Sequence, residues 1–238
     1  MAGIGEVIDE LLTLSDEKCD AMQTRRHEYE QRQEANRRGS ALQDLASDCG
    51  PRIFSTIEKY KIYDDAQRGP VEALRQYIND LEQMREAGRG IFLIGKPGTG
   101  KDHLAVSVAR EFVTQLGGQS RWLDCADFRS TLRDAIKAGR PTEEELLRPW
   151  IAADCLILSD PCPPSATLTD FQAEALFRLV DSRYRAKRCT FVTANFQPGE
   201  ADKLLGSQVV DRLSHGALRL ECGWPSYRMR STGEAEQS

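Results

Sequence analysis

Two glycines and a lysine stand at a spacing that could bind phosphate, since Gly95, Gly100 and Lys101 follow the pattern GxxxxGK. In such a loop the glycines let backbone N–H groups turn toward phosphate oxygens, and the lysine adds a mobile positive charge. An apolar run, residues 91–94, comes before the loop, and an amphipathic segment comes after it. This order predicts a strand, a P-loop and a helix whose N-terminus favours anions, so we expect a nucleoside triphosphate as the ligand.

The candidate nucleotide-binding residues are the loop itself and the first residues of the helix that follows. They are Gly95, Lys96, Pro97, Gly98, Thr99, Gly100, Lys101, Asp102 and His103. One position departs from the P-loop pattern, because Asp102 stands where a Ser or Thr hydroxyl would hold magnesium. A carboxylate can also bind this metal, although it brings negative charge toward the triphosphate. We therefore expect ATP or ADP together with Mg²⁺ as cofactors, with Asp102 as a candidate metal ligand.

Two polar side chains follow predicted strands farther along the chain. Asp160 ends an apolar run that begins at Cys155, and it could hold magnesium directly or through its waters. The alternative is an aspartate that merely ends a buried strand. Asn195 follows the predicted strand 189–193 and could orient water beside the terminal phosphate, or it could be an ordinary turn asparagine. We take Asp160 as a metal ligand and Asn195 as a catalytic candidate.

The elements that must position these residues alternate between strand and helix from Gly90 onward. This alternation is typical of an α/β fold, in which helices flank a parallel sheet. The predicted strands lie at residues 91–94, 121–125, 155–160, 189–193 and 217–220. Asp127 and the capping boxes that begin at Thr142 and Thr169 mark the starts of three predicted helices. The P-loop and Asp160 are therefore expected at one edge of the sheet.

Turn signals and charge divide the chain into three parts. We expect a helical N-terminal segment at residues 1–50, a nucleotide-binding domain at residues 51–230 and a polar tail at residues 231–238, with Gly50 and Pro51 at the first boundary. The N-terminal segment carries two apolar groups at helical spacing, separate from the main core, with arginines and glutamates between them. That charged stretch is either a solvated helix face with ion pairs four residues apart or a docking arm for a protein or nucleic-acid partner.

Composition limits the class of protein. The chain has 238 residues and a formal net charge of -5, which argues against coating DNA by charge alone. Its seven cysteines form no C-x-x-C pair, and its three histidines have no ligand spacing, so we expect reduced thiols and no zinc site. No apolar run reaches the length that spans a bilayer, and the N-terminus is acidic where a secretory signal would be basic. We expect a cytoplasmic protein that does not enter a membrane.

Five short sequences together carry a resemblance to a known family. They are GKPGTGKDHLA at residues 95–105, the strand that ends in Asp160, TAN at residues 193–195, VVDRL at residues 209–213 and SYRMR at residues 226–230. With these, residues 52–230 resemble the DnaC and IstB branch of the AAA+ ATPases. DnaC-type members load the replicative helicase, and IstB-type members help an insertion-sequence transposase. The resemblance implies an AAA+ form of the P-loop fold.

The resemblance also implies roles for single residues. It places Lys101 on the phosphates, Asp160 at magnesium, Asn195 as sensor 1 and Arg228 as sensor 2. Arg212 would be a finger that reaches the nucleotide of a neighbouring subunit, which implies self-assembly. The family's acidic residue after the magnesium aspartate is replaced by Pro161, which has no side-chain base. We therefore expect hydrolysis to be slow or absent.

Three functions agree with these observations. The first is a helicase-loader type of AAA+ protein that uses ATP or ADP as an assembly switch, with a replicative helicase bound through the N-terminal segment and single-stranded DNA as a second candidate partner. The second is a transposition helper of the IstB type. The third is a nucleotide-binding adaptor with no turnover.

Overall fold

The computed structural model describes residues 4–162, 168–196 and 199–228 of the chain, which falls into two compact units. The first unit is Met1–Ser40 and the second is Ala41–Ser238. Two sequence expectations lie outside the described residues: Arg230 of the SYRMR motif and the tail 231–238.

The first unit consists of most of helix α1, which runs from Ile4 to Cys49. Two ion pairs four residues apart lie along it, Arg26 with Glu30 at 2.9 Å and Arg38 with Glu34 at 2.8 Å. The side chains of residues 22–37 are exposed. This arrangement matches the solvated helix face, and such exposed pairs contribute only about 0.3–0.5 kcal/mol each to stability.

The second unit is built on a parallel sheet with strand order β2-β3-β4-β1-β5. Its strands are β1 (Ile91–Gly95), β2 (Ser120–Asp124), β3 (Cys155–Ser159), β4 (Cys189–Ala194) and β5 (Leu218–Cys222). The register places Thr193 beside both Leu93 and Ser159. The carboxyl ends of the three central strands, β3, β4 and β1, therefore meet at one edge, as the sequence predicted.

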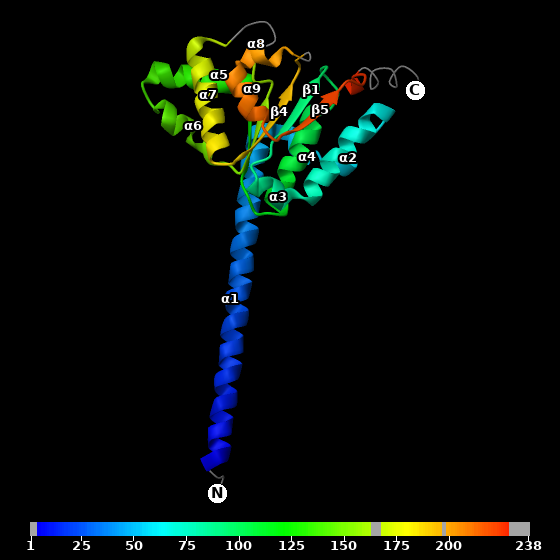
Figure 1. Ribbon diagram of the computed structural model, residues 1–238. Coiled ribbons are helices and arrows are strands. Elements are labelled where there is room, and N and C mark those ends of the chain that lie inside the picture. Colours follow the sequence, from blue (N-terminus) through cyan, green and yellow to red (C-terminus); the bar gives the residue numbers. More distant parts are fainter. Residues whose placement is uncertain (1–3, 163–167, 197–198, 229–238) are drawn as a thin grey trace. The chain divides into compact units, whose positions relative to one another are not determined.

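Helices cover both faces of this sheet (Figure 1). One face packs against α2 (Arg68–Asn79), α3 (Leu81–Glu86) and α4 (Lys101–Thr114). The other packs against α5 (Cys125–Ala138), α6 (Glu143–Ala152), α7 (Asp170–Arg185), α8 (Ala201–Leu205) and α9 (Ser207–Ser214). Strand residues alternate between the two layers, so Leu93 lies in the first and Phe92 in the second. The α/β fold expected from the sequence is confirmed.

The last turns of α1 belong to the second unit. Leu45 is fully buried and Cys49 almost so, and both lie in the hydrophobic cluster that contains α4. Asp48 accepts two hydrogen bonds from the guanidinium of Arg121 on β2, at 2.5 and 3.0 Å. The chain therefore divides after Ser40 rather than at residue 50, because the end of the helix contributes to the core.

Three short 3-10 helices connect α1 to α2. They are η1 (Gly50–Phe54), η2 (Ile57–Lys59) and η3 (Asp65–Gln67). They run past the N-terminal half of α4, where the ring Nε2 of His103 donates a hydrogen bond to the carbonyl of Thr56, 2.8 Å away. Gly50 has a φ of 59°, a left-handed conformation in which glycine carries little strain. This connection brings residues from before the P-loop to the P-loop helix.

Two of the three predicted helix caps are confirmed. The side chains of Thr142 and Thr169 accept hydrogen bonds from the backbone N–H groups of Glu145 and Gln172, each in a complete capping box. Asp127 does not cap α5, because that helix begins at Cys125 and the carboxylate of Asp124 accepts from the N–H of Asp127 at 2.7 Å. None of the described helices is long and apolar enough to cross a membrane.

A candidate nucleotide-binding site

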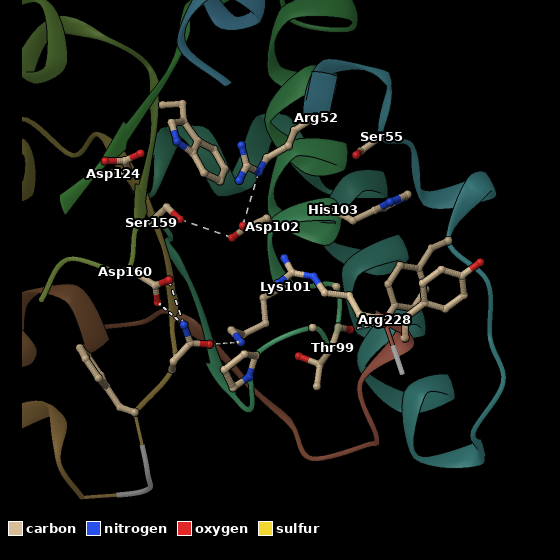
Figure 2. Close-up of a pocket in the computed structure, with 18 of the residues that line it drawn as sticks. Arg52, Ser55, Thr99, Lys101, Asp102, His103, Asp124, Ser159, Asp160 and Arg228 are labelled. Atoms are coloured by element: carbon tan, nitrogen blue, oxygen red, sulfur yellow. Dashed lines mark hydrogen bonds and ion pairs between the residues drawn. The ribbon is translucent and has the colours of Figure 1, made fainter. Parts of the chain in front are cut away.

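A cavity of about 1170 Å³ opens where the central strands of the sheet end (Figure 2). The P-loop forms its floor, with Lys101, Asp102 and His103 at the start of α4. Its other lining residues include Arg52, Tyr60, Tyr63, Trp122, Asp124, Arg129, Asp160, Asn195, Tyr227 and Arg228. Among the described residues, three of the predicted site residues do not line this cavity: Gly95, Lys96 and Arg212.

Lys101 is buried at the centre of the site. Its ammonium donates hydrogen bonds to the carbonyls of Gly95 and Lys96, each at 2.9 Å, and to the side-chain oxygen of Asn195 at 2.8 Å. Burial lowers the pKa of this ammonium, while the nearby carboxylates of Asp160 and Asp102 raise it. A buried cation whose partners are neutral oxygens is suited to bind a phosphate group instead of those oxygens.

Asn195 connects this lysine to Asp160. Its amide nitrogen donates to both carboxylate oxygens of Asp160, at 2.8 and 2.9 Å. Asp160 itself has a φ of 43°, and its N–H donates to the carbonyl of Thr193 at 2.7 Å. Burial, and next the charge of Asp102, raise the pKa of Asp160. The structure therefore brings together Lys101, Asn195 and Asp160, which were predicted as site residues from three separate parts of the sequence.

Asp102 lies beside this group, at the carboxyl ends of β3 and β4. Its Oδ1 accepts a hydrogen bond from the hydroxyl of Thr193 at 2.8 Å and a longer one from Ser159 at 3.5 Å. Its Oδ2 lies 3.5 Å from the Nε of Arg52 (Figure 2). The carboxylate is thus held by hydroxyl groups on one oxygen and by a cation on the other.

The two candidate metal ligands are compatible with magnesium. Magnesium sites on P-loops use one or two protein carboxylates, with phosphate and water oxygens as the remaining ligands. Asp102 and Asp160 line the same cavity and interact electrostatically, which is the donor set such a site requires. No group of three or more His, Cys, Asp or Glu side chains in the described ranges could hold a metal by itself.

Residues from both ends of the second unit hold the P-loop in place. The carbonyl of Thr99 accepts hydrogen bonds from the hydroxyl of Tyr60 at 2.9 Å and from the indole N–H of Trp224 at 2.8 Å. The N–H of Tyr227 donates to the carbonyl of Gly98 at 2.9 Å. Gly98 has a φ of 81°, and a Cβ there would lie 2.0 Å from the hydroxyl oxygen of Ser226. The SYR sequence near the C-terminus therefore closes over the loop.

Aromatic side chains line one side of the cavity. Tyr60 and His103 contact each other edge to face, with ring centroids 5.4 Å apart. Tyr63 and Tyr227 lie 5.9 Å apart in a tilted arrangement, and the hydroxyl of Tyr63 donates to the carbonyl of Pro225 at 2.6 Å. Such a surface could hold a nucleobase, because aromatic faces stack on bases.

The two arginines selected by the resemblance lie in different places. Arg228 lines the cavity, and its positive charge lowers the pKa of Lys101, after the larger effect of burial. Arg212 instead donates from Nε to the carboxylate of Asp181 at 2.7 Å, and its guanidinium lies 4.8 Å from the ring centroid of Phe177. Arg228 is thus beside the candidate phosphate site of its own chain, whereas the predicted role of Arg212 requires a second subunit.

Sequence reasoning missed several residues of the site. Arg52, Tyr60 and Tyr63 lie 32–43 residues before Gly95 in the sequence and belong to no motif, although all three line the cavity. Trp224 follows the last strand and belongs to none of the five short sequences, yet its indole N–H donates to the carbonyl of Thr99. The nearest signal was the SYR sequence at residues 226–228, because the resemblance implied that Arg228 acts at the nucleotide.

Comparisons with known proteins agree with this geometry. The sequence model of a family described as IstB-like ATP binding protein matches residues 21–235. The replicative helicase loader DnaC of Escherichia coli (strain K12) is 29% identical over 196 residues, which cover 82% of this chain and 75% of that protein. DnaC of Buchnera aphidicola subsp. Acyrthosiphon pisum (strain APS) is 30% identical over 197 residues, with the same shares covered.

A comparison of structures supports the fold. A crystal structure of the DnaC helicase loader superposes with a TM-score of 0.64 at 23% sequence identity, over 73% of this chain and 99% of that one. The residues that the family model matches include the P-loop, strand β3 with Asp160 directly after it, and Asn195. The chain therefore belongs to the family of IstB-like ATP binding proteins, with the P-loop fold of the AAA+ class.

Proposed function

We propose that this chain is a nucleotide-binding AAA+ protein of the replicative helicase-loader type, which uses ATP or ADP as an assembly switch and hydrolyses ATP slowly or not at all. In this proposal it acts in the cytoplasm. The observation that carries the nucleotide part is the connection of Lys101 to Asp160 through Asn195, inside a cavity floored by the P-loop.

The phosphates would replace the present partners of Lys101. Its three acceptors in the structure are two P-loop carbonyls and the Asn195 amide oxygen. A charge-assisted bond to a phosphate oxygen is stronger than one to a neutral oxygen. When the lysine binds the phosphates, Asn195 loses its hydrogen bond from Lys101 and keeps those to Asp160. The amide of Asn195 is then available to interact with the terminal phosphate. Arg228, on the same cavity, would contribute a further positive charge as sensor 2.

Mg²⁺ would be held by Asp160 and Asp102 and would neutralise charge between the phosphates. The position after Asp160 limits the chemistry, because Pro161 is buried and offers neither a proton acceptor nor a backbone N–H. General-base help or positioning of water is typically worth about 10²–10⁴ in rate. Binding without efficient turnover is the behaviour expected of a switch.

The helicase part of the proposal is supported by the relatives. Two proteins named as replicative helicase loaders align over 82% of this chain. The first unit, residues 1–40, would bind the helicase, since it carries exposed charged side chains and lies outside the nucleotide-binding unit. Single-stranded DNA is a second proposed partner. Arg212 would reach the nucleotide of a neighbouring subunit in an assembled form, as a trans-acting finger does.

A pull-down with the replicative helicase of the same organism tests this proposal. We expect the full chain to retain the helicase in the presence of ATP or ADP, and a chain that begins at Ala41 to lose it while still binding nucleotide. The control is a full chain with Arg75→Gln, which changes an exposed side chain on α2 in the second unit. Retention of the helicase by the shortened chain, or its absence with the full chain under every nucleotide condition, would contradict the helicase part.

A transposition helper of the IstB type is the second candidate, favoured by the family match over residues 21–235. The neighbouring genes separate the two: a transposase gene beside this one supports the helper, and a replication module supports the loader. A nucleotide-binding adaptor with no turnover is the third, favoured by Pro161. A turnover assay with and without single-stranded DNA separates it from the other two.

A further inference from the structure

A cation lies beside one oxygen of the Asp102 carboxylate. Arg52 lies with its Nε 3.5 Å from Oδ2 of Asp102, and Figure 2 shows its side chain directed at that carboxylate. The side chain of Arg52 is 50% exposed and that of Asp102 is 37% exposed. The pair therefore borders open solvent in the cavity, where ions can enter.

The other oxygen of Asp102 already has partners. Oδ1 accepts from Thr193 at 2.8 Å and from Ser159 at 3.5 Å, so two strands fix the orientation of the carboxylate. Oδ2 is the oxygen left for a cation. A divalent ion and a guanidinium cannot both contact it in the same place, because their charges repel and their ligand geometries differ.

Arg52 is itself held by contacts outside the P-loop. Its guanidinium carbon lies 5.2 Å from the ring centroid of Trp122, and one of its terminal nitrogens donates to the carbonyl of Cys49 at 3.4 Å. Cys49 is the last residue of α1, and Arg52 belongs to η1, which follows at once. The cation at Asp102 therefore belongs to the segment that directly follows α1 within the second unit.

A carboxylate at this position needs a nearby positive charge when nucleotide binds. Like charges separated by a few ångströms oppose binding, and a cation near the carboxylate relieves that repulsion. Lys101 is one such cation, but in the proposed function its ammonium binds the phosphates. Arg52 is the cation that remains at Oδ2 when no metal is bound.

We propose that Arg52 and a divalent cation compete for Oδ2 of Asp102, so that Arg52 is a positioning residue for the metal of the nucleotide site. This proposal rests on the proposed nucleotide binding. Without metal, Arg52 neutralises Asp102 and lets nucleotide bind; when Mg²⁺ arrives, it displaces the guanidinium. The position of Arg52, in the segment directly after α1, would therefore depend on whether the site holds a metal.

The experiment measures binding of a fluorescent ADP analogue by anisotropy, first in EDTA and then over a titration with Mg²⁺. In Arg52→Gln we expect the metal-free affinity to fall by about two- to fivefold, the size typical of a partly exposed ion pair. The Mg²⁺ half-effect concentration, at which half of the change in affinity for the ADP analogue has occurred, should fall by a similar factor. The reason is that the metal no longer has to displace a cation. Arg52→Lys, which keeps the charge, should restore part of the metal-free affinity.

Two controls separate this competition from a general effect of charge. Arg129→Gln removes the same charge from a residue that lines the same cavity. The described hydrogen bonds and ion pairs of Asp102 do not involve Arg129. Arg129→Gln should leave the Mg²⁺ half-effect concentration unchanged. In an Asp102→Asn background, Arg52→Gln should no longer alter that concentration.

The results that overturn the proposal are distinct from failure of the proposed function. If nucleotide binds but Arg52→Gln leaves the Mg²⁺ half-effect concentration unchanged or raises it, Arg52 does not compete with metal. An equal shift in Arg129→Gln would assign the effect to the overall charge of the cavity and also overturn it. Absence of nucleotide binding in the parent and all variants would overturn the proposed function, and this proposal with it.

Discussion

The side chain of Asn195 joins Lys101 to Asp160, accepting one hydrogen bond from the lysine and donating two to the aspartate. One amide thus connects the P-loop to the carboxylate at the end of β3. Since Asn195 follows β4, which lies between β1 and β3 in the sheet, the strand order itself brings the three residues together. In the proposed function a phosphate group enters this network, so its members are the residues to test.

Replacement of Lys101 should separate binding from folding. Lys101→Ala removes a charge-assisted contact worth about 1.5–3 kcal/mol, so ATP and ADP affinities should fall by roughly tenfold or more. Because burial lowers the pKa of this ammonium, the ligand-free fold should lose little stability. Isothermal titration calorimetry and thermal unfolding measure the two effects. Unchanged affinities for both nucleotides would mean that the glycine-rich turn is only structural.

Replacement of Asn195 should affect ATP more than ADP. Asn195→Ala removes the amide that we place beside the terminal phosphate, together with a hydrogen bond of about 1 kcal/mol. We expect the ratio of ATP to ADP affinity to change by several-fold, with ADP affinity nearly constant. ADP thus serves as the internal control in a competition assay. An equal loss for both nucleotides would show that Asn195 supports the loop without sensing the terminal phosphate.

Two truncations should behave differently. A chain that begins at Ala41 keeps Leu45, Cys49 and the Asp48–Arg121 pair, and should unfold cooperatively like the parent. A chain that begins at Pro51 loses them. Removal of one buried leucine alone costs about 2–5 kcal/mol, so the second truncation should be destabilised by at least that amount. Denaturant unfolding followed by circular dichroism measures the difference, and equal midpoints would restore the boundary at residue 50.

The ion pair of Arg212 with Asp181 should give a pH-dependent contribution to stability. The hydrogen bond from Arg212 holds the pKa of Asp181 below its ordinary value of 3.8, and Arg185 adds to this effect. A depressed carboxyl pKa stabilises the fold above the ordinary value and loses its effect as pH falls through the folded value. Arg212→Ala should therefore lower the denaturant concentration at the midpoint of unfolding at neutral pH. The difference in midpoint between the parent and Arg212→Ala should shrink as pH falls below 3.8.

Arg178→Ala is the matched control for this measurement, because the exposed side chain of Arg178, on the helix that carries Asp181, pairs with Glu174 on that helix and with Glu143 on α6. It should change the midpoint little at any pH. A loss in Arg212→Ala that is as large at low pH as at neutral pH would show that packing on Phe177, rather than the ion pair, stabilises this part of the fold.

The P-loop and the strand ends could be predicted from sequence because their signals are local. An apolar run before Gly95 and another before Asp160 suffice to place a strand, and parallel strands bring their carboxyl ends to one edge. The capping boxes at Thr142 and Thr169 are local too, and both formed. Asp127 was assigned as a cap because it precedes Phe128, but the helix begins earlier, at the end of β2.

The remaining features depend on contacts between distant segments. The boundary at Gly50 was predicted from a turn signal, and α1 does end there, yet burial of Leu45 places the preceding turns in the core. A turn signal reports where a helix stops and not what it packs against. Arg52 could not be identified for the same reason, since its partners, Asp102 and Trp122, are fifty or more residues away in sequence.

The central claim is that this site binds nucleotide through the P-loop but turns it over poorly because Pro161 replaces an acid. The most direct measurement compares ATP binding with single-turnover hydrolysis at saturating Mg²⁺ in the parent, in Pro161→Glu, in Asp102→Thr and in the double variant. We predict tight binding with little hydrolysis in the parent, and a rate raised by about 10² or more in Pro161→Glu. A rise only in Asp102→Thr would assign the limit to metal placement, and a parent that hydrolyses ATP at the rate of an ordinary family member would contradict the claim.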